Sequence, residues 1–117
     1  MIGESTSRAV VQAVKEELAF SKVQHEEKFH SLHEAESIIR EELEELEERV
    51  EQCRGMFEHI HEITRGTAAG MAYDADGSAN SAASILATYA ELAAEEAIQL
   101  AAMCLKLVEM AGREDEV

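Results

Sequence analysis

The sequence has no proline and no tryptophan, and its aromatic residues are limited to three phenylalanines and two tyrosines. Nothing in it therefore breaks a helix as strongly as proline does. Two cysteines, Cys53 and Cys104, are too few for a disulfide framework, and we expect both to be small core residues in a reducing compartment. No apolar run approaches the roughly 20 residues of a membrane span, and the N-terminus lacks a basic-then-apolar signal pattern. We expect a soluble cytoplasmic protein.

Basic residues are also scarce. Ten Lys and Arg face 25 Asp and Glu, which gives a formal net charge of -15. This balance argues against binding a nucleic acid polymer, which needs a stripe of cations along the phosphates. It is compatible with divalent cations, and with anionic ligands that a cation bridges. A chain of 117 residues is one domain that buries a modest fraction of its surface, so we expect a dimer or tetramer to complete its core.

Ala, Glu and Leu dominate the composition, which favours long helices. Apolar residues at helical spacing predict an all-α protomer, with helices at about 5–28, 32–65 and 80–111. Ser31 and Glu34 have the spacing of a capping box, which predicts that the second helix begins near Leu32. Gly112 is expected to end the third helix.

The stretch 66–80, which is rich in Gly and small residues, is expected to be a loop, with Met71 and Tyr73 as possible tethers. Asp74 and Asp76 within it are interpreted as turn formers rather than ligands. The tail 113–117 is expected to be disordered.

The second helix carries a heptad seam, which favours packing in a left-handed bundle. Its members are Ile39, Leu43, Leu46, Val50, Cys53, Phe57 and Ile60. Gly55 lies within this seam and is a candidate for a kink. The third helix is Ala-rich and apolar on most sides, so it is expected to be the most buried element. One of its seams comprises Leu86, Ala90, Ala93, Ala97, Leu100, Cys104 and Leu107.

Two pairs of polar residues interrupt apolar stripes on these helices. Glu42 and Glu45 follow Ile38 on the second helix, and Glu96 and Gln99 follow Leu92 on the third. Residues at i and i+3 share one face of a helix, so two facing pairs place three carboxylates and one amide around a common point. Oxygen ligands of this kind suit Mg²⁺ or Mn²⁺. The pattern therefore predicts a metal site between the two helices, although a solvated acidic face is the alternative for the second helix alone.

Three stretches, 41–45, 33–42 and 96–103, together resemble the small MazG-like proteins, a family of all-α nucleoside triphosphate pyrophosphohydrolases. Glu41-Glu42-Leu43-Glu44-Glu45 is similar to the E-E-x-x-E motif of that family, and the run from His33 to Glu42 leads into it. Glu96-Ala97-Ile98-Gln99-Leu100-Ala101-Ala102-Met103 is similar to a second motif of the family. The resemblance covers roughly residues 10–65 and 85–110.

The resemblance implies an obligate homodimer or homotetramer that hydrolyses a nucleoside triphosphate to the monophosphate and pyrophosphate with Mg²⁺. By position, Glu42 and Glu45 match the catalytic ligand pair, and Glu96 matches the third carboxylate. Gln99 stands where the family motif has aspartate. An amide oxygen can bind Mg²⁺ but carries no charge and cannot act as a base, which leaves open whether the chain is active.

Four further residues are candidates for binding the nucleotide. Lys15, Lys22 and Arg49 are the cations expected nearest to the triphosphate, although Arg49 can also pair with Glu45. His33 can contact the nucleotide or simply pack at the start of its helix.

A first alternative is a catalytically inactive helical interaction protein with the same fold. In that case a hydrogen-bond donor such as Tyr89 satisfies Glu96, and no metal is needed. A second alternative is a di-iron carboxylate bundle, which requires inward-facing Glu-x-x-His pairs. Glu27 with His30 and Glu58 with His61 have that spacing. The second pair falls off the core seam, and the first pair lies where the pattern of the first helix fades. His59 and His61 are expected to be exposed.

Overall fold

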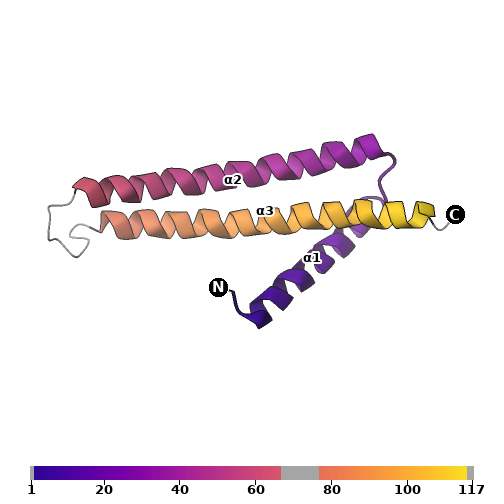
Figure 1. The fold of residues 1–117 in the computed structure, drawn as a ribbon, viewed down its shortest axis with the longest axis horizontal. Helices are drawn as coiled ribbons and strands as arrows, with labels where there is room; N and C mark the ends of the chain where they lie inside the picture. Colours follow the sequence, from indigo (N-terminus) through magenta and orange to yellow (C-terminus); the bar gives the residue numbers. More distant parts are fainter. Residues whose placement is uncertain (1, 67–76, 116–117) are drawn as a thin grey trace. The chain divides into compact units, whose positions relative to one another are not determined.

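The computed structural model describes residues 2–66 and 77–115, with side chains described as far as Met110. These residues form three helices, α1 (Glu4–Gln24), α2 (Leu32–Gly66) and α3 (Ser78–Asp115), and no strand (Figure 1). The predicted all-α class is therefore confirmed. None of these helices combines the length and apolar character that crossing a membrane requires.

Helix α1 ends earlier than the predicted residue 28. Its C-cap is His25, whose extended backbone still donates from N–H to the carbonyl oxygen of Ser21 at 2.8 Å. The chain leaves the helix here and then buries Phe29, which is only 2% exposed. Burying a large aromatic side chain stabilises the unit more than a further turn of the polar residues 25–28 would.

Helix α2 begins at Leu32, as predicted. The backbone N–H of Glu34 donates to Ser31 Oγ at 3.1 Å, which is the serine half of the predicted capping box. The helix runs without a break through Gly55 to Gly66. The space around Gly55 is open, with nothing within 4 Å of a Cβ placed there.

Helix α3 is longer at both ends than predicted. It begins at Ser78, directly after Gly77, whose φ of 76° is a left-handed conformation that suits glycine. It continues through Gly112 to Asp115, so the predicted end at Gly112 is wrong. Gly77 is the glycine with positive φ among the described residues, and Gly112 lacks the left-handed conformation that ends many helices. The predicted loop positions 71, 73, 74 and 76 lie outside the described residues.

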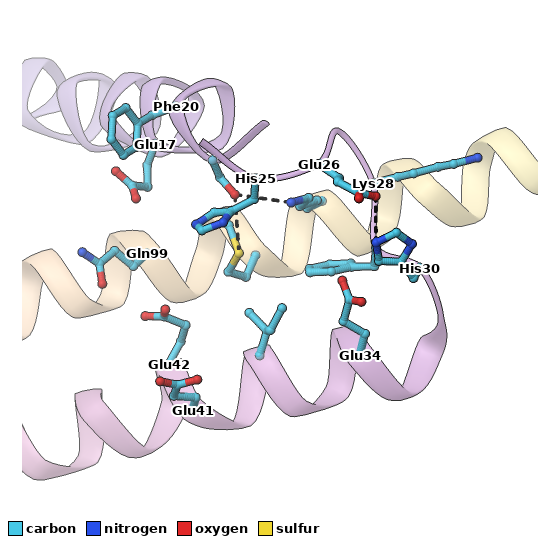
Figure 2. Close-up of a pocket in the computed structure, with 15 residues that line it drawn as sticks. Glu17, Phe20, His25, Glu26, Lys28, His30, Glu34, Glu41, Glu42 and Gln99 are labelled. Carbon is cyan, nitrogen blue, oxygen red and sulfur yellow. Dashed lines mark hydrogen bonds and ion pairs between the residues drawn. The ribbon is translucent and has the colours of Figure 1, made fainter. Parts of the chain in front are cut away.

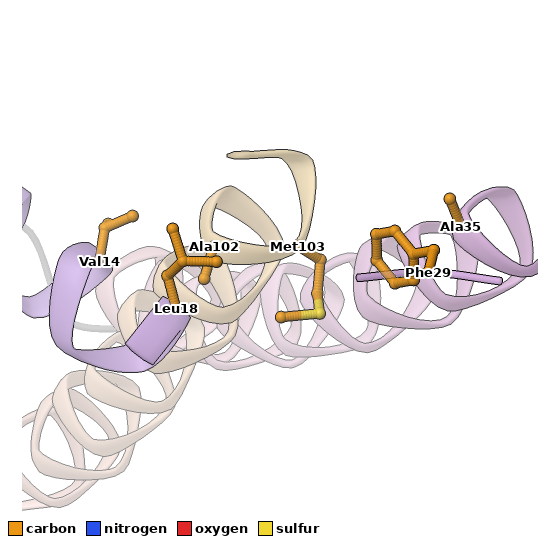
Figure 3. Packing of buried hydrophobic residues seen from close by; sticks show 6 residues of the cluster. All are labelled: Val14, Leu18, Phe29, Ala35, Ala102 and Met103. Carbon is orange, nitrogen blue, oxygen red and sulfur yellow. The ribbon is translucent and has the colours of Figure 1, made fainter. Parts of the chain in front are cut away.

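The chain forms two compact units. The first comprises Met1–Glu45 and Glu95–Val117, and the second comprises Leu46–Ala94. The core of the first unit joins all three helices and the segment between α1 and α2 (Figure 3). Its buried residues are Val14, Leu18, Phe29, Ala35, Ala102 and Met103. In the second unit, Ala82 is buried and the rings of Phe57 and His61 stack 6.4 Å apart.

Burial in the single chain is limited. No large side chain is fully buried among the described residues. Helix α3 contributes Ala82, Ala102, Met103 and Lys106 to the buried positions. Cys104 is exposed and Cys53 is half-buried, so the expectation of two core cysteines is wrong for Cys104. The α2 seam is exposed at every seventh residue: Leu43 is 42% exposed, Val50 50% and Phe57 59%. We call these three residues the α2 stripe.

Candidate metal and phosphate site

The two glutamate pairs predicted from spacing do converge. One carboxylate oxygen each from Glu42, Glu45 and Glu96 can be chosen so that all three lie within 4.8 Å of one another. The first two residues lie on α2 and the third on α3, and all three are half-buried and belong to the first unit. Three acidic oxygens at this separation repel one another, and a cation between them would remove that repulsion.

Gln99 completes the group. A polar atom of its amide lies 3.1 Å from Glu96 Oε2 and 3.1 Å from Glu42 Oε2. With the nitrogen on this side, the amide donates a hydrogen bond to each carboxylate, which is the arrangement that suits the cation-free protein. With the oxygen on this side, the amide becomes a fourth oxygen ligand. Rotation of the Gln99 amide would therefore suit either a cation-free or a cation-bound site.

The carboxyl group of Glu42 has a strongly raised pKa. Burial, together with the neighbouring charges of Glu45, Glu96, Glu41 and Glu17, raises the pKa of this carboxyl from the ordinary 4.5 to about 7, and burial is the largest cause. These charges come from all three helices. The protein thus holds a proton on Glu42 through much of the acidic range, and a bound cation must displace that proton near neutrality.

We expect this proton to make the cation-free protein depend on pH. A raised pKa in the folded state stabilises the fold below the ordinary pKa, and this contribution is lost as the pH rises through about 7. In EDTA, the melting temperature of wild type should therefore decrease relative to that of Glu42→Gln as the pH is raised from about 5 to about 8. The exposed Glu44, replaced by glutamine, is the control, and its curve should stay parallel to wild type. A pH-independent difference between wild type and Glu42→Gln would contradict the raised pKa.

A cavity of about 600 Å³ adjoins the glutamates (Figure 2). Figure 2 shows Glu17 from α1, Glu41 and Glu42 from α2 and Gln99 from α3 around it. The cations and imidazoles of its wall are Lys28, Lys106, His25 and His30. A cavity with carboxylates and ammonium groups in its wall suits a ligand that brings a cation and an anion together, such as a metal–phosphate complex.

The predicted nucleotide-binding residues do not line this cavity. Lys15 and His33 are exposed, and Lys22 pairs with Glu109, with Nζ 2.5 Å from Oε2. Arg49 belongs to the second unit and donates from Nη1 to Gln52 Oε1 at 3.1 Å. The cavity residues that the sequence interpretation missed include Glu17, Ser21 and Lys106. A signal for Lys106 was available, since it is a lone charge between Leu105 and Leu107 in an apolar stretch.

The residues proposed as ligands in the di-iron alternative do not have the positions that a di-iron site requires. Glu27 and His30 lie between α1 and α2, where helical spacing does not apply, and His30 instead pairs with Glu26 at 2.8 Å. Glu58 and His61 are exposed in the second unit, and His59 is exposed as predicted. These groups therefore do not form the inward-facing pairs that a di-iron bundle requires.

Comparison with protein-family models, curated proteins and solved structures gives no match to this chain. The assignment of function depends on the geometry of the site and on the motifs in the sequence.

Proposed function

We propose that the chain is a Mg²⁺-dependent nucleoside triphosphate pyrophosphohydrolase that resembles the MazG-like family. The observation that carries the proposal is the convergence of Glu42 and Glu45 with Glu96, two pairs of motif positions that are far apart in the sequence. The neighbouring cavity, with acidic and basic groups in its wall, supports a metal–phosphate ligand over an isolated ion.

The donor set fits Mg²⁺, with Mn²⁺ as a substitute. Three carboxylates and one amide provide oxygen ligands only, and Mg²⁺ prefers oxygen while keeping several waters. Glu42, Glu45, Glu96 and Gln99 would hold the ion. When bound, the ion would supply Lewis-acid neutralisation of phosphate oxygens and lower the pKa of a bound water.

The acidic residues of the chain would then divide the remaining work. Gln99 cannot accept a proton, so it serves as a ligand and as an orienting donor. Glu17 and Glu41 also line the cavity, and their carboxylates are available to take a proton from an attacking water. The exposed imidazoles of His25 and His30 lie in the same wall and are candidates to contact the nucleotide.

We further propose that the active form is a homodimer or a larger homo-oligomer. The core of the single chain is small, and the α2 stripe remains exposed at heptad spacing. A second copy that packs against this stripe would bury it in the manner of a helical bundle.

The alternative is an inactive helical protein of the same fold. It is favoured by one observation, which is that the Gln99 amide can satisfy Glu42 and Glu96 without any metal. Titration of Mg²⁺ and Mn²⁺ into the wild-type protein by calorimetry, followed by pyrophosphate release assays across the set of nucleoside and deoxynucleoside triphosphates, separates the two functions. Saturable binding and turnover support the enzyme, whereas the absence of both supports the inactive protein.

Replacing Gln99 by glutamate should make the fold dependent on the cation. The new carboxylate would face Glu42 and Glu96 where an amide now lies 3.1 Å from each. Loss of two hydrogen bonds and added repulsion should cost about 1–3 kcal/mol in EDTA. Saturating Mg²⁺ should restore most of the melting temperature, because three carboxylates and the new one attract the ion more strongly. Gln24→Glu, at the exposed end of α1, is the control. An unchanged melting temperature of Gln99→Glu in EDTA would contradict the predicted contact.

A further inference from the structure

Lys106 is the buried cationic side chain among the described residues of the first unit. The proposed metal ligands do not explain why a lysine is buried here. It is 4% exposed, and Ser21, 5% exposed, is the other buried polar residue among those that the structure describes. Both line the cavity beside the glutamates. Burying an ammonium group is costly unless an opposite charge or several acceptors compensate.

The contacts of Lys106 do not fully offset the free-energy cost of burying its ammonium group. Its Nζ donates to Ser21 Oγ at 3.4 Å and lies 4.9 Å from the centre of the Phe29 ring. The ion pairs formed within the described part of the chain involve Lys22, His30 and Arg40, and none involves Lys106. An ammonium has three N–H donors, so further donors remain for a ligand in the cavity.

The place of Lys106 in α3 does not explain its burial. Helix α3 continues to Asp115, so Lys106 is nine residues before its end and outside the last turn, where a cation interacts favourably with the helix dipole. Lysines on apolar helix faces usually extend their ammonium group into solvent, whereas this one is enclosed.

The register of α3 relates Lys106 to the metal ligands. Gln99, Met103 and Lys106 follow one another at i, i+4 and i+7 and all line the cavity, so they share one face of the helix. Seven residues correspond to a rise of about 10 Å, and side chains on a helix lean toward its N-terminus. Gln99 and the carboxylates lie toward the N-terminus of α3 from Lys106, which is the side on which a metal-bound polyphosphate would lie.

We propose that Lys106, positioned by Ser21 and Phe29, is a phosphate-binding residue that contacts the polyphosphate group of the ligand. This inference rests on the proposed function for the identity of the ligand as a nucleoside triphosphate. It assigns recognition of the negative charge to a cation on α3 rather than to Lys15, Lys22 or Arg49.

The test measures calorimetric binding of three probes to wild type and to Lys106→Met. The probes are Mg²⁺ alone, inorganic tripolyphosphate without metal, and a nucleoside triphosphate with a methylene group between its α and β phosphorus atoms, added with Mg²⁺. Methionine retains much of the length of lysine and removes the charge. Arg8→Met is the matched control, since Arg8 is exposed on α1 and does not line the cavity.

We expect Lys106→Met to weaken binding of the analogue by about ten- to a hundredfold, the usual effect of one charge-assisted hydrogen bond. Mg²⁺ binding and all binding by Arg8→Met should stay unchanged. Lys106→Met should melt at the same or a higher temperature in the absence of ligand, because an incompletely paired buried charge is removed. A lower melting temperature with unchanged affinity for the analogue shows a purely structural lysine and overturns the inference.

The probes separate failure of the inference from failure of the proposed function. If wild type binds Mg²⁺ and the analogue, and Lys106→Met binds both equally well, the inference is wrong and the proposed function stands. If wild type binds no Mg²⁺, the proposed function is wrong. In that case the titration of tripolyphosphate into wild type and Lys106→Met tests the inference by itself. Binding of tripolyphosphate that is lost in Lys106→Met supports an anion site, and equal binding or none overturns it.

Discussion

Replacing Glu42 by glutamine should weaken the proposed Mg²⁺ binding and slow the proposed pyrophosphate release by at least about a hundredfold, because one of the three proposed charged ligands is lost. Glu42 is the centre of the group, since its carboxylate contacts the Gln99 amide and the charges of Glu45 and Glu96 act on its pKa. Glu96→Gln should have a comparable effect from the other helix. Calorimetric titration and a pyrophosphate release assay measure the two quantities.

The same substitutions should leave the fold intact. Glutamine resembles the protonated form of glutamate, which is the form that burial favours at Glu42. The cation-free Glu42→Gln protein should therefore melt at or above the temperature of wild type at neutral pH. Glu44→Gln, one exposed position along the same helix, controls for the loss of charge. If Glu42→Gln, Glu96→Gln and Glu44→Gln all bind Mg²⁺ as wild type does, the carboxylates form an acidic surface and not a metal site.

The second large effect is expected at the α2 stripe. If the chain forms the proposed oligomer through this stripe, introducing glutamate at Val50 or Phe57 should dissociate it. The fold of the single chain should tolerate either change, because both side chains are already half exposed or more. Burying an apolar side chain of this size contributes about 1.5–3 kcal/mol to the free energy of association. In a symmetric dimer the substitution is present in both chains, so the loss is doubled. The dissociation constant should therefore rise by about 10² to 10⁴.

Light scattering coupled to size exclusion, run across a range of protein concentrations, measures this effect. Val23→Glu is the matched control, because Val23 is 81% exposed at the end of α1 and lies outside the α2 stripe. Circular dichroism of the variants establishes that helix content is retained. A monomeric wild type, or a mass unchanged by both substitutions, would rule out the stripe as the interface.

The sequence predicted the local features and the main acidic group well. The Ser31–Glu34 spacing placed the start of α2 correctly, and the i, i+3 pairs on α2 and α3 brought three glutamates to one point. These features depend on helical periodicity, which the sequence carries directly. The expectation that Glu96 joins Glu42 also required the two helices to face each other in the right register, which the sequence analysis assumed and did not derive.

The cavity could not be predicted in the same way. It depends on where α1 ends and on how the chain returns through Phe29, and both are decided by tertiary packing. The expected extension of α1 to residue 28 would have continued the helix past the point where the chain turns to bury Phe29 in the core. Lys106 was overlooked because a single lysine in a helix is usually solvated.

The small core of the first unit has a consequence for how the protein responds to its ligand. The cavity wall includes residues of α1, α2, α3 and the segment between α1 and α2, which are the elements that the core joins. A ligand that binds the folded state adds free energy by mass action, about 2.7 kcal/mol at a hundred times its dissociation constant. For a unit in which no large side chain is fully buried, this amount is a substantial share of a typical stability. A ligand bound in this cavity would therefore raise the free energy of unfolding of the first unit as its concentration rises.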